Sequence, residues 1–136
     1  MVGIKKGSWD IVAKEYNDAV KDEGHMVHKL YLNPVVLKLL GNVKNKKILD
    51  LACGNGYFSK KLEDKEARVT GVDYSKELLK IAESKKKKNS KMKFIKGSSS
   101  NMKFLKDHSF DMIVSNMSFM EDCKKIILIN TSLPLH

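Results

Sequence analysis

The feature that most constrains the fold is an alternation of strand patterns with helix patterns, which begins at Lys47. KKILDL is a short apolar run, and after the turn ACGNG the residues Phe58 and Leu62 stand four apart, which is helical spacing. The runs ARVTGVD, MKFIK and SFDMIVSN supply three more strand patterns, and Ser75 caps a helix pattern between the first two of them. Strands that alternate with helices predict a parallel sheet with helices on its faces, in the α/β class.

The segment before this alternation carries helix patterns only. Ser8, a residue type that caps helices, precedes a segment with one apolar face. That face consists of Trp9, Val12, Tyr16 and Val20. A short second helix is expected next, and Asn33-Pro34 predicts the cap and first turn of a third helix. We therefore expect residues 1–45 to form a helical cover and residues 46–136 to form the core, within one structural domain.

Size and composition fit a single folded unit. The chain has 136 residues, of which 42% are hydrophobic, enough for one core but not for two. No segment approaches the roughly 18 uncharged apolar residues of a membrane helix, and the N-terminus lacks the apolar centre of a signal peptide. We therefore expect a soluble, cytoplasmic protein with no membrane partner. Cys53 and Cys123 have neither disulfide-framework nor metal-ligand spacing, so no metal site is expected.

The positive charge of the chain is carried almost entirely by lysine. Basic residues outnumber acidic ones by 26 to 16, which gives a formal net charge of +10, yet Arg68 is the single arginine. Lysine lacks the planar fork that makes bidentate contacts to phosphates and bases. We therefore expect no nucleic-acid partner, and a non-catalytic, lysine-rich nucleic-acid-binding module stays open as an alternative function.

Chemically useful residues follow each strand pattern. In open parallel sheets, ligands bind beyond the carboxyl ends of the strands. The residues at those ends are Asp50, Gly54 and Gly56, then Asp73 and Tyr74, then Ser98 and Ser99, and finally Ser115 and Asn116. Gly54 and Gly56 allow a sharp turn and a close approach of a ligand to the backbone. Asp73 stands about 20 residues after Gly54, the separation at which an acid holds the hydroxyls of an adenosine ribose.

Asp50 and Ser59 bear on which adenosine cofactor this turn would accept. An unpaired carboxylate at Asp50 would repel a pyrophosphate and attract the ammonium group of a methionine moiety. Ser59 also occupies the place of the third glycine in the GxGxxG fingerprint of dinucleotide sites. Both observations favour S-adenosylmethionine over NAD, and a nicotinamide-dependent oxidoreductase remains the alternative enzyme. An Asp50 that only bonds the backbone of the adjacent turn also stays open.

Four stretches between about Lys47 and Lys125 resemble the class I S-adenosylmethionine-dependent methyltransferases, especially those with a DxxCGxG first motif that act on small molecules. These stretches are ILDLACGNGYFSKKL, VTGVDYSKELLKIA, FIKGSSSNMKF and SFDMIVSNMSFM. WDIVAKEYNDAV also resembles the helix that these enzymes fold over the cofactor. The resemblance implies a Rossmann-like, doubly wound sheet. It also implies methyl transfer to an oxygen, nitrogen or carbon nucleophile of a small-molecule acceptor.

The resemblance further implies a set of cofactor contacts. Those contacts are Asp50, Ala52, Cys53, Gly54 and Gly56 around the methionine part, Asp73 on the ribose hydroxyls, Tyr74 against the adenine, Ser98 and Ser99 near the adenine edge, Asn116 beneath the sulfonium, and Tyr16 closing over the pocket. Ser98 replaces the usual aspartate of the family, and a hydroxyl is a weaker acceptor than a carboxylate. For Cys53, a small buried residue is the simpler interpretation.

No catalytic residue is assigned from the sequence. Methyl transfer from a sulfonium needs alignment more than covalent help, so a base is optional. His25 and His28 in the N-terminal cover are candidates for such a base, against the simpler interpretation of exposed or locally bonded histidines.

The strand count departs from the family. The methyltransferase sheet has seven strands, whereas four strand patterns are found here, and ILINTSLPLH stands where a helix should lead into the fifth strand. We therefore expect a C-terminally truncated member that lacks the last strands. In that case the fourth strand, FDMIVS, becomes an exposed edge, through which the chain could self-associate.

Overall fold

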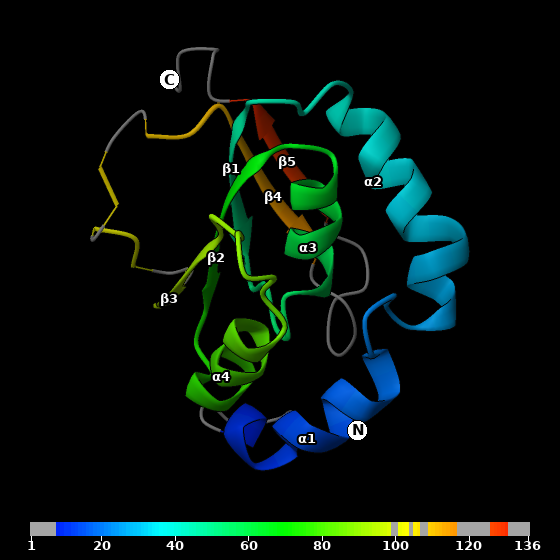
Figure 1. Cartoon of the computed structure of the whole chain (residues 1–136), viewed down its shortest axis with the longest axis vertical. Helices are drawn as coiled ribbons and strands as arrows, with labels where there is room; N and C mark the ends of the chain where they lie inside the picture. The colour runs from blue at the N-terminus through cyan, green and yellow to red at the C-terminus, as the bar shows by residue number, and fades with distance from the viewer. Residues whose placement is uncertain (1–7, 99–100, 104, 107–108, 117–125, 131–136) are drawn as a thin grey trace.

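In the computed structural model the chain forms one five-stranded sheet (Figure 1). The strands are β1 (Lys47–Leu51), β2 (Arg68–Asp73), β3 (Lys93–Lys96), β4 (Met112–Asn116) and β5 (Ile126–Asn130), in the spatial order β3-β2-β1-β4-β5. The structure describes residues 8–98, 101–103, 105–106, 109–116 and 126–130. The first four strands are parallel, which confirms the predicted Rossmann-like α/β sheet. The strand order reverses between β1 and β4, which is where such sheets bind ligands.

The fifth strand corrects the prediction of an exposed fourth strand. β5 pairs antiparallel with the whole of β4, from Met112 opposite Asn130 to Asn116 opposite Ile126. An antiparallel partner needs no crossover helix, and the isoleucine-rich run IILIN favours a strand over the helix expected near it. β4 is therefore an inner strand. Its edge is covered by β5, so it is not open for the predicted self-association.

The main core lies between the sheet and the helices in front of it (Figure 1). Helices α3 (Tyr57–Asp64) and α4 (Lys76–Ser84) are the predicted connections after β1 and β2. The core consists chiefly of Ile48, Val69 and Val114 from the strands, Phe58 and Leu62 from α3, and Val36 and Leu40 from the N-terminal helices. The N-terminal cover and the sheet thus share one hydrophobic cluster. Leu49, Leu51 and Val72 form a second, smaller cluster.

The N-terminal segment contains α1 (Ser8–Val20), the π-helical turn η1 (His28–Leu32) and α2 (Asn33–Leu40). α2 begins at Asn33, has Pro34 in its first turn and ends before Gly41, as predicted. The backbone is nevertheless helical without a break over residues 26–40, so Asn33 continues a helix and does not cap one. The Asn33 N–H donates to the His28 carbonyl, five residues back. Proline lacks an N–H and disturbs a regular helix, and the wider turn immediately before Pro34 accommodates it.

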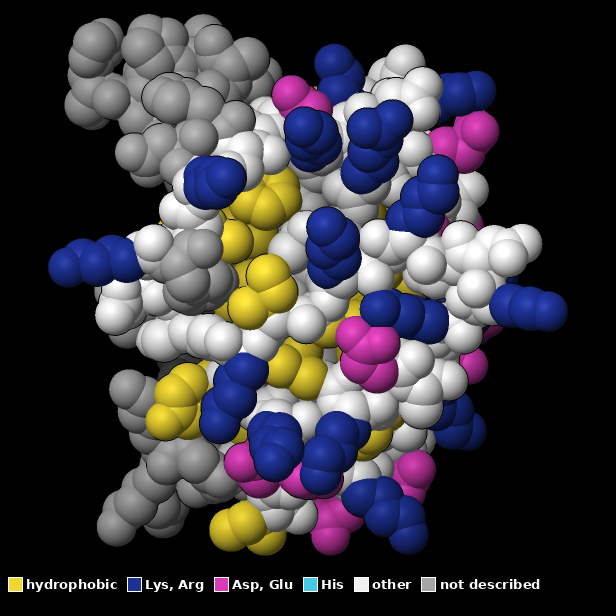
Figure 2. All heavy atoms as spheres, turned by 60° about the vertical axis from the view of Figure 1, so that its left-hand side comes forward, with side chains coloured by type: hydrophobic (Ala, Val, Ile, Leu, Met, Phe, Trp, Pro, Cys, Tyr) yellow, Lys and Arg dark blue, Asp and Glu magenta, His cyan; other side chains and the backbone are white. Residues whose placement is uncertain are grey.

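The lysines are spread over the surface rather than gathered in one array. Figure 2 shows the side that carries β3, where basic side chains stand among acidic and apolar ones. Lys80 pairs with Glu77 at 2.8 Å and Lys86 with Glu83 at 2.9 Å on α4. Within the described residues, no helix has the length and apolar character needed to cross a membrane.

Candidate functional site

The turn after β1 is built from residues with left-handed backbone conformations. The φ angles are 56° at Ala52, 56° at Gly54 and 79° at Gly56, and glycine adopts such angles at no steric cost. The Cys53 N–H donates to the Val72 carbonyl of β2 at 3.1 Å, and the Gly56 N–H donates to the Cys53 carbonyl at 3.0 Å. The turn is thereby fixed against β2 and ends at the start of α3.

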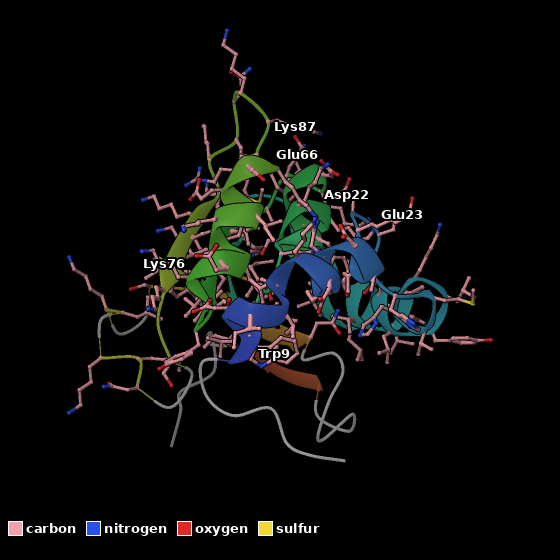
Figure 3. The ribbon with its side chains drawn as sticks, turned by 90° about the horizontal axis from the view of Figure 1, so that it is seen from below. Trp9, Asp22, Glu23, Glu66, Lys76 and Lys87 are labelled. Atoms are coloured by element: carbon pink, nitrogen blue, oxygen red, sulfur yellow. The ribbon has the colours of Figure 1, made fainter. Side chains whose placement is uncertain are left out.

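Tyr16 of α1 lies over this turn. A Cβ added at Gly54 would stand 3.4 Å from both Cε1 and Oη of Tyr16, so a larger residue at Gly54 would press on the ring. Trp9 packs edge-on against Tyr16, with ring centroids 5.6 Å apart. Figure 1 shows α1 beyond the end of the sheet where the parallel strands finish, and Figure 3 views the chain from that end. Tyr16 therefore lies over the glycine turn, and its contact with a cofactor, which the resemblance implies, stays a prediction.

Asp73 links the turn to the start of α4. Its Oδ2 accepts the Gly54 N–H at 2.8 Å, and its Oδ1 accepts the Ser75 N–H at 2.8 Å. Burial raises the pKa of Asp73, while the N–H donors of Ser75 and Gly54 act in the opposite direction. A carboxylate has about four lone-pair positions. Each oxygen of Asp73 can therefore accept a further hydrogen bond.

Asp50 is buried and paired, contrary to the expectation of an unpaired carboxylate. It is 2% exposed, and the Ser59 hydroxyl donates to its Oδ2 at 2.6 Å. Burial raises the pKa of Asp50 to about 7, the Ser59 hydrogen bond opposes this rise, and the charge of Asp73 adds to it. The hydrogen-bond partner of Asp50 is thus the Ser59 side chain of α3 and not the backbone of the adjacent turn. Ser59 was considered only as a missing glycine, and its spacing to Asp50 gave no sign of this contact.

Cys53 fits the simpler interpretation of a small buried residue. Its side chain is 6% exposed, and a Cβ added at Gly71 would come within 2.8 Å of its Sγ. The sulfur is therefore packed against β2. Burial raises the pKa of the Cys53 thiol well above its usual range, which disfavours the reactive thiolate.

Asn116 joins a buried polar cluster that sequence reasoning missed. Its Nδ2 donates to Asn33 Oδ1 at 3.2 Å and to Tyr57 Oη at 3.3 Å, and Tyr57 Oη donates to Asn33 Oδ1 at 3.3 Å. The three residues come from β4, α2 and α3. In the sequence Asn33 indicates a helix cap, and a tyrosine inside a helix pattern carries no signal of a polar role. The cluster fixes the end of β4 to the N-terminal cover.

Asn55 is a second site residue that the sequence analysis did not single out. It is fully buried, and its Nδ2 donates to Asn17 Oδ1 at 3.0 Å and to the Lys21 carbonyl at 2.9 Å. Its Oδ1 accepts the Tyr57 N–H at 3.2 Å. One side chain therefore holds α1 and the residue after it against the glycine turn. Its position between the two glycines of the motif was the available signal.

Asp10 makes a further link between α1 and the site. Its Oδ1 accepts the Ser75 hydroxyl at 2.6 Å and the Glu77 N–H at 3.1 Å. Ser75 also caps α4 by accepting the Leu78 N–H at 3.1 Å. An acid at a helix N-terminus is stabilised by the unpaired N–H groups there. The hydrogen bonds from Ser75 and Glu77 lower the pKa of Asp10.

The residues expected near an adenine follow β2 and β3. Tyr74 is 42% exposed, and Lys96 Nζ lies 5.9 Å from the centroid of its ring. Ser98 forms an isolated bridge with Asn101, whose N–H donates to the Ser98 carbonyl at 3.0 Å. Ser99 lies outside the described residues. Tyr74 thus offers an accessible ring beside the Asp73 carboxylate.

The two histidines differ in burial. His28 is 4% exposed and packs edge-on against Tyr57, with ring centroids 6.3 Å apart. Burial, and secondarily the charge of His25, lower the pKa of His28, so its imidazole is neutral at pH 7. His25 is half-buried. His28 is therefore a packed residue of the cover, close to the polar cluster.

Comparison with known proteins decides the family. Residues 48–128, more than half of the chain, match the family described as "Methyltransferase domain". The chain belongs to this methyltransferase family. The matched range runs from β1 into β5 and includes the glycine turn, Asp73 and Asn116.

Relatives of this methyltransferase chain are considerably longer than it is. It is 33% identical over 94 residues to the malonyl-[acyl-carrier protein] O-methyltransferase of Hamiltonella defensa. This alignment covers 68% of this chain and 35% of that protein. It is 40% identical over 60 residues to the ubiquinone biosynthesis O-methyltransferase of Idiomarina loihiensis, which covers 41% of this chain and 24% of that protein. The chain thus spans about a third of the first relative and about a quarter of the second.

A solved structure shares the fold. The S-adenosylmethionine-dependent methyltransferase of Mesorhizobium loti superposes with a TM-score of 0.56 at 26% identity, over 60% of this chain and 37% of that one. The methyltransferase fold of the sheet is therefore supported by sequence and by structure.

Proposed function

We propose that the chain binds S-adenosylmethionine at the carboxyl ends of β1 and β2 and takes part in methyl transfer to a small-molecule acceptor. The observation that carries this proposal is the Asp73 carboxylate, which bonds the Gly54 N–H of the turn and the Ser75 N–H before α4. It stands at the end of β2, within hydrogen-bond distance of the glycine turn. The family membership and the names of the relatives support the same activity.

The residues present fit this cofactor. Gly54 keeps the turn free of a Cβ under Tyr16, and the spare lone pairs of Asp73 suit two ribose hydroxyls. Tyr74 presents an exposed ring for an adenine. Asp50 is buried, and we assign it a role through its negative charge, which favours an ammonium group near the turn.

The cofactor supplies a methyl group that is already activated by the sulfonium. The protein's task is to hold the acceptor nucleophile in line with that methyl group and to exclude water. Asn55 and Asp10 position α1, and therefore Tyr16, over the turn. His28 is neutral at pH 7, which is the form that accepts a proton, although its burial against Tyr57 makes a packing role the simpler assignment.

Substitution of Asp73 tests the ribose assignment. Asp73→Ala is expected to weaken binding of S-adenosylhomocysteine by about 1.5–3 kcal/mol, the usual range for hydrogen bonds to a charged group, as measured by titration calorimetry. The matched control is Asp111→Ala. Asp111 also accepts a backbone N–H, from Lys47 at 2.8 Å, but at the opposite ends of the strands, so its removal should leave affinity unchanged. Equal affinity of a folded Asp73→Ala variant and the wild type would refute the assignment.

Parallel titrations separate the other function classes. Binding of NADH in place of S-adenosylhomocysteine would support the nicotinamide-dependent oxidoreductase. Binding of RNA alone, with a steep salt dependence, would support the lysine-rich nucleic-acid module. The place of the third glycine is filled by Ser59, whose hydroxyl is bonded to Asp50, so we expect no NADH binding.

Proton release provides a second test of the site. A cationic ammonium near Asp50 favours the ionised carboxylate, whose pKa is about 7 without ligand. Binding of S-adenosylhomocysteine at pH 6.5 is therefore expected to release protons, and the release should diminish above pH 8. Calorimetry in two buffers of different ionisation enthalpy measures this quantity. Zero release at pH 6.5 would show that Asp50 does not sense the ligand.

A further inference from the structure

The outer side of the helical segment 26–40 carries a continuous set of exposed apolar side chains. We call this set the apolar ridge, and it consists of Met26, Val27, Leu30, Tyr31, Val35 and Leu39. Each side chain is at least 50% exposed, and Met26 reaches 70%. The opposite side of the segment is packed into the core through Val36 and Leu40. The segment is therefore apolar on both sides, and its outer side has no protein partner among the described residues.

The π-helical turn brings the side chains of the ridge closer to one line along the helix. Val27, Tyr31, Val35 and Leu39 are spaced four residues apart, and such positions lie on one face of a helix. In a helix with 3.6 residues per turn, a spacing of four drifts around the axis. The wider turn of η1 takes up part of this drift. Figure 1 shows the segment at the right-hand edge of the chain, and in Figure 3 its outer side chains point away from the other elements.

The chain segment that carries the ridge is basic. Residues 24–49 contain no aspartate or glutamate. They contain the exposed lysines Lys29, Lys38, Lys44, Lys46 and Lys47. Lys29 pairs with Glu23, and Lys44 pairs with Glu66 at 3.1 Å, both on the surface, where ion pairs contribute little and exchange partners readily. Among the described residues, no carboxylate pairs with Lys38. Lys38 is separated from Met26 and Leu30 by multiples of four residues, so it lies near the same face of the helical segment.

We propose that the apolar ridge docks onto the surface of an anionic phospholipid bilayer. Apolar side chains flanked by lysine suit the boundary between headgroups and acyl chains, and tyrosine is enriched at that boundary. Lysines near an anionic leaflet add attraction. A second copy fits less well, because two ridges facing each other would bring like charges together. The segment has fewer than the roughly 20 residues needed to cross a bilayer, so it lies in the interface.

Vesicle sedimentation tests the proposal on the full chain. The wild type is expected to sediment with vesicles of phosphatidylcholine and phosphatidylglycerol at 7:3 and to bind much less to phosphatidylcholine alone. Tyr31→Glu is expected to reduce the partition coefficient about tenfold or more, because it puts an acid among the apolar side chains. Lys38→Gln is expected to reduce it about fivefold.

The matched control is Ile11→Glu. Ile11 is 83% exposed, more than any residue of the ridge, but it lies on α1, so this variant should bind vesicles like the wild type. All variants alter exposed positions, and circular dichroism with thermal unfolding verifies that they remain folded.

Three results would overturn the proposal. They are an absence of wild-type binding to the anionic vesicles, equal binding by Tyr31→Glu, or a wild-type dimer in light scattering that Tyr31→Glu dissociates without any vesicle binding. The last result would assign the ridge to a second copy. The assay needs no cofactor, so its outcome is independent of the methyltransferase proposal.

Discussion

Asp50→Asn is expected to raise the free energy of unfolding at pH 8 by up to about 4 kcal/mol. The pKa of the buried Asp50 carboxyl is about 7, against 3.8 for the solvated group. A gap of about three pH units corresponds to about 4 kcal/mol at ~1.4 kcal/mol for each. Asparagine avoids the buried charge, and its carbonyl can still accept the hydrogen bond from Ser59.

The same pKa sets the direction of the pH dependence. Between about pH 4 and pH 7 the folded chain keeps the proton on Asp50 while the unfolded chain loses it. The folded state therefore binds more protons in this window, and the free energy of unfolding contributed by Asp50 falls as the pH rises. Below the window both states are protonated, and above it both are ionised. Outside the window the contribution of Asp50 to the free energy of unfolding therefore no longer changes with pH. The stability from the neutral carboxyl is thus fully present at low pH and lost through pH 7.

Urea unfolding at pH 5 and at pH 8 measures this contribution. The gain in the free energy of unfolding of Asp50→Asn over the wild type should be about 4 kcal/mol at pH 8 and less than half of that at pH 5. The matched control is Asp111→Asn, at an exposed aspartate directly before β4 that also accepts a hydrogen bond. Because this carboxylate is not buried, its replacement should give a much smaller gain at pH 8 than Asp50→Asn. A pH 8 gain below 1 kcal/mol for Asp50→Asn would show that the folded chain solvates or pairs the Asp50 charge.

Asn55→Ala is expected to destabilise the chain by about 3 kcal/mol or more. The substitution removes three hydrogen bonds at a fully buried position, each worth about 1 kcal/mol. It also leaves the Tyr57 N–H without that partner, whereas the Lys21 carbonyl still accepts a hydrogen bond from Lys85 Nζ at 3.3 Å. Each buried polar group left unsatisfied costs about 1–3 kcal/mol. Since the same side chain bonds Asn17, the loss should also loosen α1 from the glycine turn.

Hydrogen exchange distinguishes this loosening from a general loss of stability. Amides of α1 should exchange faster in Asn55→Ala than the global destabilisation explains, while β1 and β2 keep the protection of the folded core. Asn42→Ala is the control. Asn42 bonds a single backbone N–H in an exposed loop, that of Lys44 at 3.1 Å, and its loss should cost less than 1 kcal/mol. Unchanged exchange of α1 in Asn55→Ala would contradict the assigned tether.

The parallel sheet, and the polar residues that its strand ends bring together, were predictable because both follow from local patterns. The strand patterns ending at Asp50, Asp73 and Asn116 identify the ends of parallel strands, and parallel strands bring those ends to one edge of the sheet. Gly54 and Gly56 were recognisable because positive φ angles favour glycine. Tyr16 came from the resemblance alone, and the structure places its ring over Gly54.

The remaining features depend on contacts that no local pattern encodes. The sequence of Ile126–Asn130 is also compatible with part of a longer helical connection. Its pairing with β4 depends on tertiary contacts and not on the local sequence. The hydrogen bond between Ser59 and Asp50 joins α3 to β1, and that between Asn55 and Lys21 spans 34 residues. Pro34 indicated a helix start, because the π-helical turn that accommodates it has no sequence signature.

The contact of Asp10 with Ser75 and Glu77 has a consequence for biosynthesis. Asp10 of α1 bonds groups that are 65 and 67 residues further along the chain. An isolated helix of 13 residues is marginal in water, so we expect α1 to remain largely unstructured until α4 has been translated. α1 thus docks only after the groups that hold it have been made, and the nascent sheet assembles with the carboxyl ends of β1 and β2 still open.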